Sequence, residues 1–206
     1  MSLATFGDLK AAIAAWITRP SSTDADLADW IALCEARLNR ELRVSRMLAR
    51  ETTTAADEFI AVPPDFLAAR WLRLTGPPYT RLGYRSPEQM AARIAEQPCG
   101  PPDSYSRVGG EFWLSPAPAD PVELELLYYA QIPALADASP SNWVLGDFPD
   151  AYLHGAVLEA ALYFEDTELA DRHSGLFAAA LEAIRSSDAR DAIAAPYAVN
   201  LIGNVV

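Results

Sequence analysis

The last third of the chain carries two helical patterns separated by a short polar run. In both, apolar residues recur at steps of three and four positions, which places them on one face of an α-helix. The first pattern begins at Asp147, Pro149 and Asp150, residue types that suit the free N–H groups of a helix start. The second runs from Leu169 to Ile184. Because the polar break at residues 165–167 is so short, the spacing predicts an antiparallel helical hairpin over 147–186.

The N-terminal part shows the same kind of pattern twice. Thr5 can cap a helix whose apolar residues share a face as far as Ile17, and Pro20 ends it. Thr23 opens a second helix, which keeps its helical spacing to about Arg43. The sequence therefore predicts two amphipathic helices over 5–43.

Between residues 49 and 130 the pattern changes to β-branched and aromatic runs separated by turn residues. We expect residues 52–54 and 59–62 to pair as a hairpin, and a further strand over 68–75. Gly109-Gly110 predicts a tight hairpin, because glycines tolerate the positive φ of its turn. The run 122–129 becomes apolar on both sides, which predicts a strand inside the sheet. A short helix is expected from Ser86.

This order of elements indicates an α+β fold, with helical hairpins at both ends around a central antiparallel β-rich region. A chain of 206 residues can bury about 70% of its unfolded surface, so a sizeable core is expected. We expect a single domain over 1–191 followed by an apolar C-terminal tail over 192–206. Residues 132–145 are expected to form a polar loop that carries Trp143.

Composition narrows the classes of partner. The net charge of −12 argues against sequence-specific nucleic-acid binding, because gripping DNA requires a basic surface that neutralises phosphates. The sequence has no apolar run of the roughly 20 residues that a membrane span needs, and no signal peptide is expected. Cys34 falls at an apolar helical position and Cys99 in a Pro/Gly loop, so we expect free thiols in a reducing compartment.

No motif with a known chemical mechanism is present, so no catalytic residue, metal site or cofactor is expected. The two histidines, His154 and His173, could face each other across the helical hairpin. The carboxylates near them in sequence are Glu159, Glu165, Asp166 and Asp171. A small enzyme or metal-binding protein with a site on these helices is one alternative, although surface carboxylates are usually solvated. Cys34 is expected to be a buried thiol without an activating base.

Two features point instead to binding. Four tryptophans, Trp16, Trp30, Trp71 and Trp113, are expected in the core. Trp143 lies in a polar loop instead and is not assigned to the core. The C-terminal tail has no charged residue, so it is expected to lie against its own sheet or against a partner. The residues expected at a partner interface are Tyr197, Val199, Leu201, Ile202 and Trp143.

Several stretches together resemble the head-to-tail adaptor, or connector, proteins of tailed bacteriophages. They are the glycine hairpin leading into Phe112–Pro116, the strand Leu126–Tyr129, and above all residues 150–161, DAYLHGAVLEAA. That last stretch resembles the family's P-D-x-Y-x-x-G-x-L-x-E-A region.

The resemblance implies a structural virion protein of the neck, made in the host cytoplasm, and not an enzyme. Such proteins form rings, commonly dodecamers, that join the portal protein to a tail protein, either nozzle or tail tube, and line the DNA passage. Another neck protein, for head or tail completion, remains an alternative.

Overall fold

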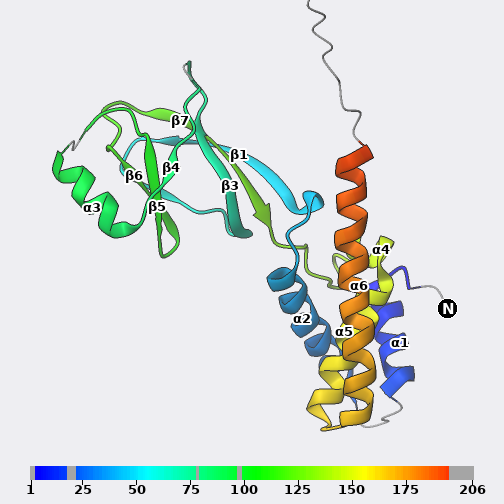
Figure 1. The fold of residues 1–206 in the computed structure, drawn as a ribbon. Coiled ribbons are helices and arrows are strands. Elements are labelled where there is room, and N and C mark those ends of the chain that lie inside the picture. The colour runs from blue at the N-terminus through cyan, green and yellow to red at the C-terminus, as the bar shows by residue number, and fades with distance from the viewer. Residues whose placement is uncertain (1–2, 18–21, 78, 97–98, 195–206) are drawn as a thin grey trace, which may run out of the picture. The chain divides into compact units, whose positions relative to one another are not determined.

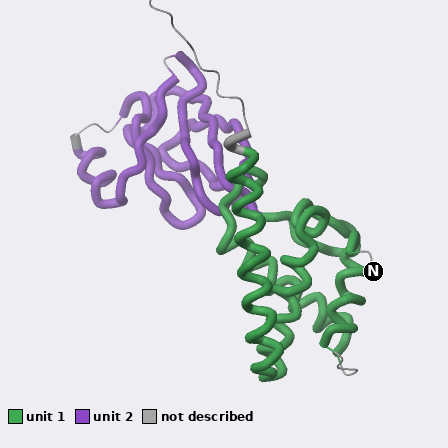
Figure 2. The backbone as a smooth tube through the Cα atoms, turned by 45° about the vertical axis from the view of Figure 1, so that its right-hand side comes forward, with its two compact units in different colours: residues 1–46, 132–206 green, residues 47–131 purple. Residues whose placement is uncertain are grey.

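A computed structural model describes residues 3–17, 22–77, 79–96 and 99–194. The chain divides into two compact units, which Figure 2 shows in different colours. Residues 1–46 and 132–206 form the helical unit, and residues 47–131 form the sheet unit. The fold is α+β, as predicted, with helices from both ends of the chain flanking the central sheets in sequence. That residues 1–191 act as one domain stays a prediction.

The helical unit contains five of the α-helices (Figure 1). They are α1 (Phe6–Ile17), α2 (Asp24–Glu41), α4 (Trp143–Asp147), α5 (Pro149–Tyr163) and α6 (Thr167–Ala194). A three-residue 3-10 turn, Ser45–Met47, follows α2. The α5–α6 pair is the predicted hairpin, and its connection is tight because Glu165 adopts a positive φ of 57°. Helix α6 continues past the predicted end at Ser186, because the Asp188 carboxylate accepts from the Ser45 N–H at 2.8 Å and anchors the extra turns.

Capping side chains fix where the N-terminal helices begin. Thr5 and Asp8 bond each other's backbone N–H groups, and Thr23 and Asp26 form the same reciprocal box at α2. Each box satisfies donors that the helix itself leaves unpaired. The predicted starts of both helices are confirmed.

The sheet unit holds two sheets and one helix, α3 (Pro87–Glu96). The three-stranded sheet has the order β1 (Leu48–Ala55), β7 (Val122–Ala130), β3 (Phe66–Leu74). The four-stranded sheet has the order β2 (Phe59–Ala61), β6 (Glu111–Ser115), β5 (Ser104–Val108), β4 (Gly83–Tyr84). The apolar strand β7 lies between two neighbours, as predicted. The β5–β6 hairpin at Gly109-Gly110 is confirmed, with a φ of 60° at Gly109.

The predicted hairpin between residues 52–54 and 59–62 is wrong. Strand β1 pairs with β7, with Thr53 opposite Leu124, whereas β2 pairs with β6, with Ile60 opposite Phe112. The two segments therefore belong to different sheets, whose facing side chains share one core. Pairing β1 with the long apolar strand β7 completes the sheet that buries Leu124 and Leu126, which a local hairpin could not do. The sheets are also not purely antiparallel, because the short strand β4 runs parallel to β5.

Candidate assembly surface

Trp143 begins helix α4, and Asn142 positions it. The predicted polar loop thus ends at Asn142, whose Oδ1 accepts from the N–H groups of Val144 and Leu145 at 3.1 and 3.0 Å. Its Nδ2 donates to the carbonyl of Pro133 and to the hydroxyl of Tyr152, both at 2.7 Å. One asparagine therefore caps the helix and ties it to the loop before it and to α5 behind it.

Arg46 lies over the Trp143 ring. The guanidinium carbon is 5.6 Å from the ring centroid, within the range of a cation–π contact. The same guanidinium pairs with Asp147, and this bond raises the pKa of Arg46. Both charged side chains are about half exposed. Trp143 is therefore half-buried beside an accessible ion pair, a combination of residue types that is common at protein interfaces.

The hollow beside Trp143 is too small for an organic ligand. It holds about 10 Å³ and is bounded by Val44, Phe148, Ile184 and Asp188 among others. That volume is near the minimum for one water molecule. The surface around Trp143 can accept a partner's side chains but offers no substrate pocket. The other predicted interface residues, Tyr197, Val199, Leu201 and Ile202, lie outside the described residues.

The two histidines do meet, as the sequence suggested. The ring centroids of His154 and His173 are 5.1 Å apart, and Trp16 packs against both rings at 5.8 and 5.4 Å. Burial lowers the pKa of each imidazole, and the Nδ1 atom of each is buried with no hydrogen-bond partner among the described residues.

Two of the four carboxylates proposed to complete a site serve other contacts, and the other two, Glu165 and Asp171, are exposed. Glu159 pairs with Arg37 of α2 at 2.5 Å, and Asp166 caps α6 by accepting from the Leu169 N–H at 3.1 Å. In the part of the chain that the structure describes, no group of three or more His, Cys, Asp or Glu side chains is placed to hold a metal ion. The arrangement is that of an aromatic packing cluster.

The cysteine and tryptophan expectations have mixed outcomes. Cys34 is fully buried, and burial raises the pKa of its thiol, which disfavours the nucleophilic thiolate. Trp30 is in the core, but Trp16 is not, because 47% of its surface is exposed. Trp71 and Trp113 are half-buried. Trp16 lies at the rim because its ring covers the histidine pair from outside instead of filling the centre of the unit.

Sequence reasoning missed two polar clusters. In the helical unit, buried Glu35 accepts from the Tyr152 hydroxyl at 3.1 Å and from the Leu135 N–H at 2.7 Å. In the sheet unit, Glu125 on β7 is paired with Arg50 and Arg73 from the two flanking strands. The available signal was a charged residue inside an otherwise apolar strand or helix face.

Together, the half-buried tryptophan and the paired charges give the surface around Trp143 a composition that is common at protein interfaces. The chain belongs to the SU10 adaptor protein family, whose model matches residues 4–200. It is thus a structural adaptor of a bacteriophage and a component of the virion that interacts with capsid or tail proteins. A search of curated proteins returned no match. Among the described residues, no helix is long and apolar enough to cross a bilayer.

Proposed function

We propose that this protein is a head-to-tail adaptor, which forms a ring, most simply a dodecamer, between the portal protein and a nozzle or tail-tube protein. The observation that carries the proposal is the match to the adaptor family over nearly the whole chain. The acidic composition supports it, because a negatively charged ring would let packaged DNA pass without binding its phosphates.

Two contacts would hold such a ring to the portal. The first is the apolar C-terminal segment, whose Tyr197, Leu201 and Ile202 would enter grooves on the portal. The second is the surface around Trp143, where the indole ring of Trp143 and the guanidinium of Arg46 lie together. Many weak contacts of this kind act jointly, so binding should be steep in protein concentration.

The test mixes the purified full-length chain with purified portal rings and examines the complexes by electron microscopy and co-sedimentation. We expect one adaptor ring on each portal. Deleting residues 195–206 should abolish co-sedimentation while leaving the circular dichroism spectrum and the melting temperature unchanged. The deletion begins where the described part of α6 ends, so it removes no helical turn that the structure describes.

Trp143→Ala should also weaken portal binding, and Tyr84→Ala is its matched control. Tyr84 is an exposed aromatic residue of the sheet unit that lies outside the proposed contact. Full binding by both the truncated chain and Trp143→Ala would contradict the proposed contacts. A wild-type chain that forms no ring on the portal would contradict the function itself.

A further inference from the structure

The three-stranded sheet presents arginine and aromatic side chains on the face turned away from the core. Leu124, Leu126 and Tyr128 of β7 point into the core between the two sheets, so Glu125 and Tyr129 point to the opposite face. The pairing register places Arg73 of β3 beside Glu125 on that face. We call this surface the arginine face; it comprises Arg50, Arg70, Trp71, Arg73, Tyr79 and Tyr129.

Glu125 organises the centre of the arginine face. Its Oε2 accepts from Nε and Nη2 of Arg73 at 3.0 and 2.7 Å, and its Oε1 pairs with Arg50. The Glu125 side chain is only 3% exposed, whereas that of Arg50 is 67% exposed. Two guanidinium groups thus share one covered carboxylate. Arg70 adds a third positive charge to the face and Glu123 a second negative one, so one positive charge remains in excess on a strongly acidic protein.

An open groove of about 460 Å³ runs beside these charges, and two aromatic rings lie near the Arg73 guanidinium that lines it. The Arg73 guanidinium lies 4.6 Å from the centroid of Trp71 and 5.9 Å from that of Tyr79. The Tyr79 side chain contributes to the groove wall and is 69% exposed. Tryptophan, tyrosine and arginine dominate the binding energy of protein interfaces, so this composition fits a protein partner. Duplex DNA fits less well, because the exposed carboxylate of Glu123 lies in the same groove.

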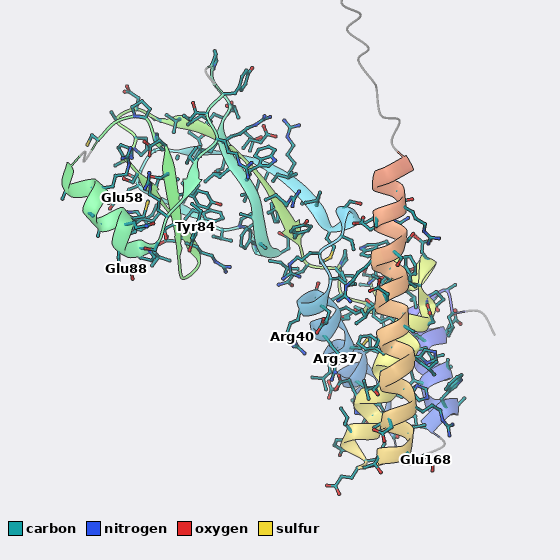
Figure 3. All side chains as sticks on the ribbon, viewed as in Figure 1. Arg37, Arg40, Glu58, Tyr84, Glu88 and Glu168 are labelled. Carbon is teal, nitrogen blue, oxygen red and sulfur yellow. The ribbon has the colours of Figure 1, made fainter. Side chains whose placement is uncertain are left out.

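A complementary surface exists on the chain itself, at the turn between α5 and α6. Figure 3 labels Glu168 at this end of the helical unit. Leu162 and Tyr163 are largely exposed there. Glu165 and Asp171 are also exposed, and neither makes an ion pair among the described residues. The turn therefore combines apolar surface with unpaired carboxylates, the counterpart of aromatic rings with excess guanidinium charge.

We propose that the arginine face of one copy binds the α5–α6 turn of a second copy. The contact joins two different surfaces of the same chain, so it is heterologous and repeats from copy to copy, and it closes into a ring when the rotation allows. This inference rests on the proposed adaptor function and deepens it, because it names the subunit interface of the ring.

Charge reversal in two variants tests the interface. Variant A carries Arg50→Glu with Arg70→Glu, which keeps the Arg73–Glu125 pair, and variant B carries Glu165→Arg with Asp171→Arg. Each variant alone brings like charges together at every contact, so ring formation on portal rings should fall by about tenfold or more. In an equimolar mixture the two variants can alternate, so that every contact pairs opposite charges, and rings should return.

The matched control is Arg40→Glu with Arg85→Glu, which makes the same change of charge at exposed arginines outside the interface. It should assemble as the wild type does. The interface would be overturned if variant A alone formed rings, or if the folded mixture formed no more rings than its components do. Either result would leave the proposed adaptor function standing. No ring from the wild-type chain would overturn both. Duplex DNA binding that variant A loses and variant B keeps would reassign the arginine face to DNA.

A cross-linking test covers the case in which charge reversal prevents folding. Tyr79→Cys and Tyr163→Cys are made separately in chains that carry Cys99→Ser, because Cys99 is exposed and Cys34 is buried. Mixing the two variants under oxidising conditions should give a disulfide-linked dimer containing one chain of each kind. A mixture that yields only same-variant dimers, or none, would overturn the interface.

Discussion

The helical unit and the sheet unit use buried carboxylates in opposite ways. In the helical unit, Glu35 accepts from Leu135 and Tyr152, which come from a loop and a neighbouring helix, so its bonds hold the unit together. In the sheet unit, Glu125 is equally covered, but it holds two arginines at the edge of an open groove. The first carboxylate braces the fold, and the second shapes a surface. We therefore expect changes in the helical unit to act on stability and changes on the arginine face to act on assembly.

The largest expected effect is in the helical core. Phe177 of α6 is buried, and Phe177→Ala should lower the free energy of unfolding by about 2–5 kcal/mol, because it removes apolar contacts and leaves a cavity. Urea unfolding followed by circular dichroism measures the change. The neighbouring Leu176 is 42% exposed, and Leu176→Ala should cost less than about 1 kcal/mol. Equal losses for the two variants would show that this face of α6 is not the buried one.

A second effect tests how closely α5 packs. A Cβ atom on Gly155 would lie 2.3 Å from Cys34 Sγ and 2.9 Å from Cε2 of Phe177. Gly155→Ala should therefore lower the free energy of unfolding by about 1–3 kcal/mol, despite the better helix propensity of alanine. Gly175 has no atom within 4 Å of such a Cβ, so Gly175→Ala should stabilise α6 by about 0.5–1 kcal/mol. If both substitutions stabilise the protein, α5 does not pack as closely against Cys34 and Phe177 as the distances at Gly155 indicate.

The histidine pair is expected to make the helical unit sensitive to acid. Burial lowers the pKa of both imidazoles; for His173, the charges of His154 and Arg172 lower it further, while Asp150 opposes the shift of His154. A folded-state pKa below the unfolded value means that the unfolded chain binds more protons. The contribution to stability is therefore complete above about pH 6.5 and is lost progressively as the pH falls from there through the lower folded-state pKa values.

Urea midpoints measured from about pH 7.5 down to about pH 5.5 should decline in the wild type. His154→Gln combined with His173→Phe should flatten that decline, because the variant has no histidine left to protonate. A slope that is the same in both proteins would assign the acid sensitivity to carboxylates elsewhere.

Sequence patterns predicted the elements of both units better than their pairings. The capping residues Thr5, Thr23 and Ser86 mark helix starts through local hydrogen bonds, which the sequence displays directly. A strand's alternation shows which side chains face the core but not which strand lies beside it, and so residues 52–54 received the wrong partner. The competing pairing with β7 depends on residues about 70 positions away, which no local pattern contains.

The candidate surfaces also divide into features that a local pattern predicts and features that depend on tertiary pairing. Trp143 could be singled out because a tryptophan in a polar loop is unusual, and the histidine pair because the helical spacing fixes its faces. The short helix at Trp143 was missed although Asn142 is a good cap, because five residues are too few to show a period. The arginine face was missed because its residues come from three strands and a loop and converge only through tertiary pairing.

The smallest expected effect on stability is at Arg50. This substitution best distinguishes a role in assembly from a role in stability. Arg50→Ala removes one partner of Glu125, but Arg73 still donates two hydrogen bonds to the same carboxylate. Because the Arg50 side chain is 67% exposed, its ion pair is screened by water, and the loss in unfolding free energy should stay below about 1 kcal/mol. The same substitution removes an exposed positive charge from the proposed interface, so ring formation should weaken and should do so most at low salt. Urea unfolding measures the change in stability, and portal-binding titrations at two salt concentrations measure the change in ring formation. A loss of stability as large as that of Phe177→Ala, with portal binding retained, would show that the Glu125 cluster braces its unit just as Glu35 braces the other.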